Sequence, residues 1–332
     1  TPLVVEVVAE ISRRGAHPMV RPRLERVQAA LLEHANDAQA AVVTALDRIE
    51  VEHPSKVLTV WAQDNNRFMT GVPSARLAVR SAALRPLFKR TIEREAAGEL
   101  RWVGTAYPCH ASAQDAGMSL ADWEDFVFDA GHLGDPDPIV FWRDQSARQK
   151  RVIEVLSQVS ELRIVARDTD LRLQVEGRRW ENADGRMNFP DGEVFTSPDA
   201  AATEGHISFS FDAPYNGREV GGVRLWFEGG RVVREHAERG AEHLTALLDQ
   251  DAGARALGEV AFGMNDEIRA ATCDTLFDEK IGGTCHVALG MAFPECGGTN
   301  ESGLHWDMVC DLRDGGEVYG DGRLIARDGR FL

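Results

Sequence analysis

The 332-residue sequence has few cysteines, and their arrangement excludes two common kinds of small site. The five are Cys109, Cys273, Cys285, Cys296 and Cys310. No two of them stand as Cys-x-x-Cys and their number is odd, so neither a disulfide framework nor a cysteine-type zinc site is indicated. Reduced thiols favour a cytoplasmic protein. The sequence also lacks low-complexity tracts, a recognisable signal peptide and any apolar run of the roughly 20 residues that span a bilayer.

Basic residues are scarce as well. Lys and Arg together number 37 against 53 Asp and Glu, which gives a formal net charge of −16. Binding to phosphates depends on clustered Lys and Arg, so a nucleic-acid partner is not expected. We expect no membrane partner either. The hydrophobic share of 43% is typical of a globular protein, and the length favours two domains.

Helical and strand-like segments alternate in the first half of the chain. Helical patterns cover residues 2–14, 24–47 (as two helices), 73–97 and 119–127, with Ser119 as an N-cap. Short apolar runs at 57–61 and 101–105 have the length of buried strands. Helices between strands imply parallel pairing. Because the chain opens on a helix rather than a strand, we expect an N-terminal segment to be missing.

The pattern changes to period two from about residue 162. Segments 162–165, 171–175, 207–211 and 223–227 alternate as half-buried antiparallel strands do. Helical intervals are expected at 236–249 and near 265–276. We therefore predict an α/β domain with a mostly parallel sheet at 1–160. An α+β domain with an antiparallel sheet, carrying a metal site, is predicted at 161–332.

Carboxylates and imidazoles recur in Gly-rich turns and apolar strands of this second domain. They are Glu193, Glu259, Asp278, Glu279, His286, His305 and Asp307. Glu259 lies in an apolar run, where a charge is costly to bury unless it is paired. His305 and Asp307 are two residues apart, which places both on one face of a strand. This mixture suits one or two divalent cations such as Zn, Co or Mn, which can activate water for hydrolysis.

Two of these residues, taken alone, also have a purely structural explanation. Glu193 fits a solvated turn, and His286 fits a core histidine bound to a backbone carbonyl. Other catalytic signatures are missing, because the sequence contains neither Gly-x-Ser-x-Gly nor His-Glu-x-x-His. Cys109 and His110 are adjacent and rarely would face each other, so a thiol nucleophile is not expected. A metal-dependent hydrolase is therefore favoured.

Four segments carry a resemblance to a known family. They are 188–198 (NFPDGEVFTSP), 257–259 (LGE), 277–286 (FDEKIGGTCH) and 304–309 (LHWDMV). In this order they resemble the thermophilic metalloaminopeptidase family, which includes aminopeptidases T and S. The likeness continues upstream at 169–171 (TDL) and 102–108 (WVGTAYP), and so extends over nearly the whole chain.

The resemblance implies a two-domain homodimer whose active sites open into an enclosed cavity. Such an enzyme removes N-terminal residues from peptides with broad specificity and uses two divalent metal ions, Mg being possible besides Zn, Co or Mn. Carried over by position, the metal ligands are Glu193, Glu259, His286, His305 and Asp307, with Glu279 as a sixth candidate. Glu259 is the expected bridging carboxylate. Glu193 or Glu279 is expected to move the proton from water to the leaving amine.

One position departs from the family pattern and leaves alternatives open. The motif usually has Tyr seven residues after its first histidine, where this chain has Phe293. If that hydroxyl stabilises the tetrahedral oxyanion, its loss removes one donor. A catalytically impaired dimeric binding protein is therefore one alternative. The other is a ring-cleaving dioxygenase on the same scaffold, because two histidines and an aspartate also form an iron facial triad.

Overall fold

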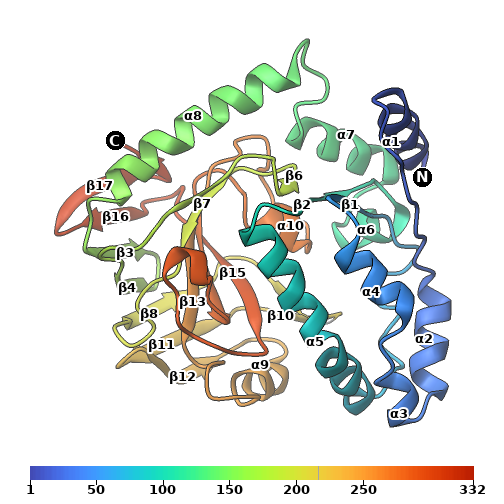
Figure 1. Ribbon diagram of the computed structural model, residues 1–332. Helices are drawn as coiled ribbons and strands as arrows, with labels where there is room; N and C mark the ends of the chain where they lie inside the picture. Colours follow the sequence, from blue (N-terminus) through green and yellow to red (C-terminus); the bar gives the residue numbers. More distant parts are fainter. Residues whose placement is uncertain (216) are drawn as a thin grey trace. The chain divides into compact units, whose positions relative to one another are not determined.

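The computed structural model describes residues 1–215 and 217–332, which form two compact units, Thr1–Gln114 and Asp115–Leu332 (Figure 1). The elements of the first unit are α1 (Pro2–Arg13), α2 (Glu25–His34), α3 (Asp37–Ala40), α4 (Ala45–Glu52), β1 (Lys56–Trp61), α5 (Ser74–Ala96) and β2 (Arg101–Ala106). The short α6 (His110–Asp115) ends at the division.

Strands β1 and β2 form a parallel pair in the first unit. Val57 lies opposite Trp102, and Val60 lies opposite Thr105. Parallel neighbours need a long crossover, and α5 supplies it here. The predicted parallel pairing is thus confirmed for these two strands.

The segment predicted as two helices at 24–47 contains three. Asn36 accepts a hydrogen bond from the Gln39 amide at 2.9 Å and begins α3. Thr44 accepts one from the Asp47 amide at 3.1 Å and begins α4. Each cap satisfies an amide that the first helical turn leaves unpaired, so a new helix begins at each.

The second unit is dominated by antiparallel strands. Its helical elements are α7 (Leu120–Ala130), α8 (Pro138–Leu156), α9 (Ala241–Leu248), α10 (Thr275–Asp278) and the 3₁₀ turn η1 (Pro294–Cys296). Its strands are β3 (Glu161–Ala166), β4 (Thr169–Gln174), β5 (Glu181–Ala183), β6 (Asn188–Phe189), β7 (Glu193–Thr196), β8 (Glu204–Ser208), β9 (Ala213–Tyr215), β10 (Arg218–Val220), β11 (Arg224–Glu228), β12 (Arg231–His236), β13 (Leu257–Gly263), β14 (Thr284–Gly290), β15 (His305–Asp311), β16 (Glu317–Gly320), β17 (Arg323–Arg327) and β18 (Arg330–Phe331).

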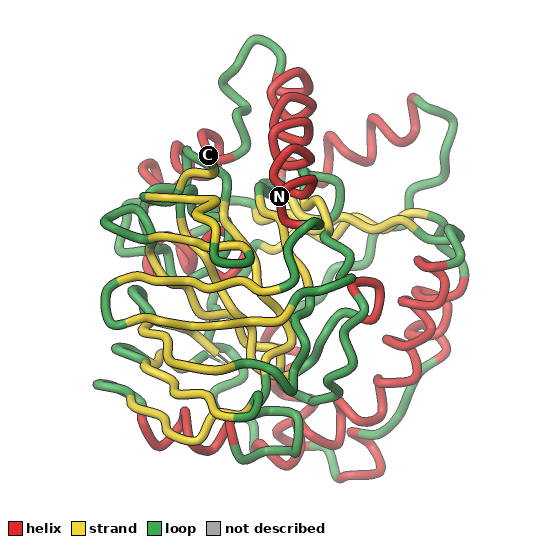
Figure 2. The backbone as a smooth tube through the Cα atoms, turned by 90° about the vertical axis from the view of Figure 1, so that its left-hand side faces the viewer, coloured by secondary structure: helices red, strands yellow, loops and turns green. Residues whose placement is uncertain are grey.

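Two antiparallel sheets share one hydrophobic core in this unit. The larger has the order β12-β11-β8-β4-β3-β16-β17-β18, and the smaller has the order β15-β14-β13-β7-β5. Figure 2 shows strands of this unit running side by side, joined by loops at their ends. Ile164 and Leu171 of the larger sheet belong to the same buried cluster as Val260 and Val287 of the smaller one. One face of the smaller sheet is therefore buried in the core that it shares with the larger sheet.

Helix α8 packs against β5 and β7 of the smaller sheet (Figure 1). The Gln149 side chain is fully buried and donates hydrogen bonds to the Ala183 and Glu193 carbonyls at 2.9 and 2.7 Å. These contacts agree with the assignment of α8 to the second unit, and the compact units divide after Gln114, upstream of the boundary predicted at 160. The prediction that a separate metal-binding domain begins at residue 161 stays a prediction.

Two of the helices expected in the second unit are shorter than the sequence suggests. Helix α9 begins only at Ala241, because residues up to His236 extend β12 and Gly240 takes a left-handed φ of 73°. The helix expected near 265–276 is reduced to α10, which Asp274 caps through the Leu276 amide at 3.1 Å. Among the described residues, no helix combines the length and apolar character that crossing a bilayer requires.

Candidate metal centre

Strand register brings five of the six predicted ligands to one face of the smaller sheet. Glu259 lies opposite Ala288, which lies opposite Asp307. Directly opposed residues of antiparallel strands share a face, as do alternate residues along one strand. His286 and His305 each precede one of these positions by two residues, and Glu193 is opposite Gly263, four residues after Glu259. We call this face, with Glu193, Glu259, His286, His305 and Asp307, the ligand face.

Small side chains separate the ligands on this face. Ala261 is opposite His286, and Ala288 lies between Glu259 and Asp307. Both alanines are fully buried, so the centre of the sheet has no bulky group above it on this side. The opposite face carries Val260 and Val287 at adjacent positions, in the shared core. The sheet therefore leaves room for cations on one face only.

The distances between ligand atoms fit a shared cation. Nε2 of His286 lies 3.4 Å from Glu193 Oε2 and 3.8 Å from Glu259 Oε1. Nε2 of His305 lies 3.2 Å from Glu259 Oε2 and 3.6 Å from Asp307 Oδ2. Atoms bound at about 2.1 Å in tetrahedral geometry are roughly 3.4 Å apart. Glu259 presents one oxygen to each imidazole, which is the arrangement of a bridging carboxylate.

Among the described residues, several buried atoms of the centre have no hydrogen-bond partner. They are Glu193 Oε2, Asp307 Oδ1 and both ring nitrogens of His286. Most buried polar atoms in proteins are paired, and a divalent cation is a partner that these converging atoms could share. Two groups bring their ligand atoms within 4.8 Å of one another: Glu193, Glu279 and His286, and Glu259, His286 and Asp307. The residues present thus fit a divalent metal.

The orientation of His305 is fixed from outside the ligand face. Its Nδ1 lies 2.9 Å from the Met291 carbonyl oxygen, to which an Nδ1–H donates. This hydrogen bond leaves the Nε2 lone pair directed at Glu259 and Asp307. Metal-binding histidines are commonly oriented by such a contact at the other ring nitrogen.

Buried charges shift the pKa values of the whole centre. Burial raises the pKa of Glu259, but the nearby imidazoles of His286 and His305 outweigh it and lower that pKa to about 2. Burial lowers the pKa of both histidines, yet the surrounding carboxylates raise it to about 9 for His286 and about 10 for His305. Burial raises the pKa of Asp307 to about 6 and that of Glu193 well above its usual range. Without metal, protonated imidazoles supply the positive charge.

A buried lysine adds a second positive group that the sequence pattern does not single out. Nζ of Lys280 lies 3.2 Å from Glu193 Oε1 and 3.9 Å from Asp191 Oδ1, and it donates a hydrogen bond to Glu279. Asp191 in turn accepts from the Gly185 and Gly192 amides. Lys280 and Asp191 lie within the motifs at 277–286 and 188–198. The available signal is a lysine that directly follows two acidic residues and precedes apolar Ile281.

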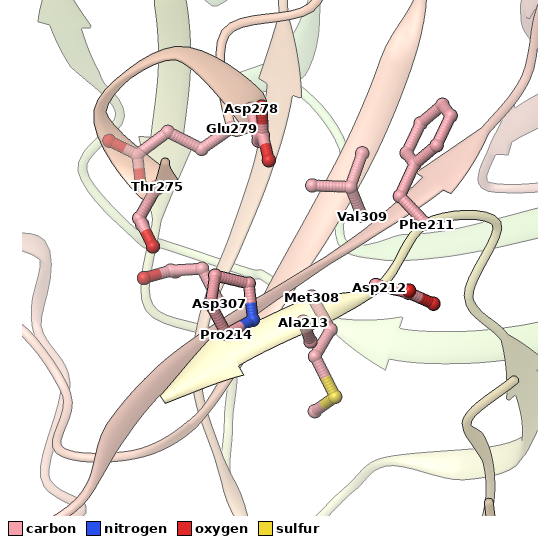
Figure 3. A pocket seen from close by; sticks show the side chains of 10 residues that line it. All are labelled: Phe211, Asp212, Ala213, Pro214, Thr275, Asp278, Glu279, Asp307, Met308 and Val309. Carbon is pink, nitrogen blue, oxygen red and sulfur yellow. The ribbon is translucent and has the colours of Figure 1, made fainter. Parts of the chain in front are cut away.

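A pocket lies beside Glu279 and Asp307 (Figure 3). In Figure 3, Thr275, Glu279 and Asp307 lie on one side of it, and Phe211 and Asp212 lie on the other. The side chains of Glu279 and His305 are 15% and 24% exposed, against 1% for His286. The centre is therefore accessible from the side of Glu279 and His305. The remaining lining residues are Ala213, Pro214, Asp278, Met308 and Val309.

Phe293 lies next to the ligand face. Its ring centroid is 5.2 Å from that of His305 and 5.1 Å from that of Phe195. Its amide donates to the Ser197 hydroxyl at 2.9 Å. The position that departs from the family pattern thus stands beside a predicted ligand and provides no hydroxyl there.

Two solved structures share this architecture. AmpT from Thermus thermophilus superposes with a TM-score of 0.82 at 27% identity, over 99% of this chain and 90% of AmpT. The mixed α/β fold expected from the sequence agrees with this match. A 2,5-dihydroxypyridine dioxygenase from Pseudomonas putida matches 94% of this chain and 98% of its own at a TM-score of 0.54. Its identity is 13%, so that similarity shows the fold alone.

Sequence comparison gives the family. Aminopeptidase 2 of Geobacillus stearothermophilus is 32% identical over 270 residues, which are 69% of this chain. The chain spans 65% of the length of that relative. The model of the thermophilic metalloprotease family (M29) matches residues 1–331. The resemblance seen in the four motifs is confirmed, and the chain belongs to the thermophilic metalloprotease family.

Proposed function

We propose that this chain is a metal-dependent aminopeptidase that uses two divalent cations to remove N-terminal residues from peptides. The observation that carries the proposal is the ligand face, where carboxylate and imidazole atoms converge at 3.2–4.0 Å and several have no other partner. Membership of a metalloprotease family supports the hydrolytic assignment. The names of the relatives support the release of N-terminal residues.

The ligands divide into two sets around a common carboxylate. Glu193 and His286 would hold one cation, and His305 and Asp307 would hold the other. Glu259 would bridge them, because its two oxygens face different imidazoles. Zn, Co or Mn suits this donor set, with Mg possible. When bound, such a pair lowers the pKa of water and polarises the scissile carbonyl.

Glu279 is the better candidate for the general base. Glu193 is buried, and its Oε2 faces His286 without a hydrogen-bond partner, as expected of a ligand. Glu279 is partly exposed and lines the pocket together with Asp307. Its carboxylate would take the proton of the attacking water and deliver it to the leaving amine. Acidic residues that line the pocket, such as Asp212, would also bind the free α-ammonium group of the peptide.

Metal content measured together with peptidase activity tests the proposal. The protein is stripped with a chelator, reconstituted with Zn, Co or Mn, and assayed on Leu-, Arg- and Phe-p-nitroanilides. Two ions per chain with restored hydrolysis is the expected result, and the stripped sample is the matched control. One oxygen-sensitive iron per chain would favour the dioxygenase instead. Fully loaded but inert protein would favour the impaired binding protein.

The assembly follows only from the resemblance. We propose a homodimer, which sedimentation of the purified protein tests directly. A single species of the monomer mass, 36.5 kDa, would contradict it. The cytoplasmic location stays a prediction that rests on the cysteine pattern.

A further inference from the structure

Lys280 is buried in a way that is unusual for lysine. The other three lysines of the chain, Lys56, Lys89 and Lys150, are exposed. The Lys280 side chain is 0% exposed. An ammonium group loses its hydration on burial, at a cost of several kcal/mol unless close partners compensate. Its place in the fold is therefore tied to the carboxylates around it.

The contacts of Lys280 separate the two oxygens of Glu193. Oε1 accepts from Lys280 Nζ at 3.2 Å, and Oε2 faces His286 Nε2 at 3.4 Å. Of the two, only Oε2 lacks a hydrogen-bond partner. With Oε1 occupied by the ammonium group, Glu193 has one oxygen left for a cation.

Lys280 also restrains the neighbouring carboxylate. It donates a hydrogen bond to Glu279 Oε1, while Glu279 belongs to a group of possible ligands with Glu193 and His286. We propose that Lys280 is a positioning residue that limits Glu193 to one ligating oxygen and keeps Glu279 out of the metal's ligand set. Glu279 is thereby left free for proton transfer, a role that rests on the proposed function.

The charges of the centre agree with this role. Five carboxylates surround it: Asp191, Glu193, Glu259, Glu279 and Asp307. Within the described residues none of the five forms an ion pair with an arginine, and Lys280 contacts three of them. Two divalent cations and one ammonium group balance five negative charges when both imidazoles are neutral. Lys280 is then the one positively charged side chain among the described contacts of the loaded centre.

Cobalt binding to the Lys280→Met protein tests the proposal without an activity assay. Freed carboxylate oxygens should enter the coordination sphere, so two Co²⁺ ions still bind, at equal or higher affinity. Their visible absorption should weaken, because a higher coordination number lowers its intensity. Lys150→Met on the exposed face of α8 is the matched control and should keep the wild-type spectrum. An unchanged spectrum of Lys280→Met, or a loss of bound Co²⁺, would overturn the positioning role.

Kinetics at saturating metal tests the consequence for Glu279. We expect kcat of Lys280→Met to fall about 100- to 1,000-fold with little change in KM, which is within the range of general-base contributions. Lys280→Arg should recover part of the loss. In a Glu279→Gln background the same change should cost little further activity. If Lys280→Met lowers kcat in the Glu279→Gln background by the same factor as in the wild-type background, Lys280 does not act through Glu279.

Two further results keep the alternatives apart. If Glu279→Gln alone is fully active, the base assignment in the proposed function is wrong, and the cobalt spectrum still decides the role of Lys280 toward Glu193. If Lys280→Met does not fold, Lys280→Gln takes its place, because an amide can still donate to one carboxylate. One amide cannot hold both Glu193 and Glu279, so at least one carboxylate oxygen is still freed and the absorption should weaken, although less than for full removal of the donor. Wild-type absorption again contradicts the proposal.

Discussion

The two faces of the smaller sheet are built from the same strands and serve different ends. On one face Val260, Val287 and Leu289 join the hydrophobic core. On the other, Glu259 and His286 alternate with those residues and converge with charged groups from neighbouring strands. Because adjacent residues of a strand point to opposite faces, a core residue and a candidate metal ligand can be neighbours in the sequence. Substitutions at adjacent positions should affect different properties.

The largest expected effect is on the ligand face, at Glu259. Glu259→Gln removes the negative charge that faces both imidazoles. We expect hydrolysis of aminoacyl-p-nitroanilides to fall by about three orders of magnitude or more, because metal ions contribute several kcal/mol to such reactions. Metal content should fall too. Retained turnover with full metal would refute the assignment, and Glu228→Gln on the exposed side of β11 is the control.

The core face should give the opposite result. Leu289 is 0% exposed and lies opposite Trp306 in the shared core. Leu289→Ala should lower the free energy of unfolding by about 2–5 kcal/mol, as truncations of buried leucines do. The folded fraction should still bind two metals per chain. Thermal unfolding and metal analysis measure both quantities, with the half-exposed Leu133→Ala as control. Loss of metal from folded Leu289→Ala would show that the two faces are not independent.

The difference between the faces also explains which parts of the molecule the sequence can predict. Strands β13, β14 and β15 are recognisable from apolar runs interrupted by Glu259, His286 and His305, because an ionisable group in such a run needs a partner. The convergence of these residues depends on register, which the resemblance implied and the alternation alone leaves open. Lys280 was missed because two of its three carboxylate partners, Asp191 and Glu193, are far away in sequence. The helix expected near 265–276 failed where Asp274 caps a much shorter one.

The pH dependence of metal binding sharpens the comparison, because the ligand face carries buried titratable groups and the core face is apolar. Raised pKa values of about 9 for His286 and about 10 for His305 stabilise the metal-free fold below pH 6.5. This stabilisation is lost as the pH rises through 9 and 10. Metal binding needs neutral imidazoles, so it should release about two protons at pH 7. Affinity should then rise about 100-fold per pH unit between pH 6.5 and 8.5.

Calorimetric titration with Zn²⁺ in buffers of different ionisation enthalpy counts the released protons. The Leu289→Ala protein serves as the control, since its ligand face is intact and should release the same number. Affinity that does not depend on pH would mean that the imidazoles are already neutral in the metal-free protein.

The smallest expected effect is a gain at Phe293. Its ring lies 5.2 Å from His305, where the family pattern places a tyrosine. Phe293→Tyr adds a hydroxyl donor beside the ligand face, and one oxyanion donor can contribute about 2.7–4 kcal/mol in a site built for it. We expect a smaller increase in kcat, about tenfold. The ring packs against Phe195, and its surroundings are adapted to phenylalanine rather than to a hydroxyl group. Phe88→Tyr at an exposed position of α5 is the control. A kcat that stays at the wild-type value would mean that oxyanion stabilisation here does not pass through position 293, and that the cations and other donors suffice.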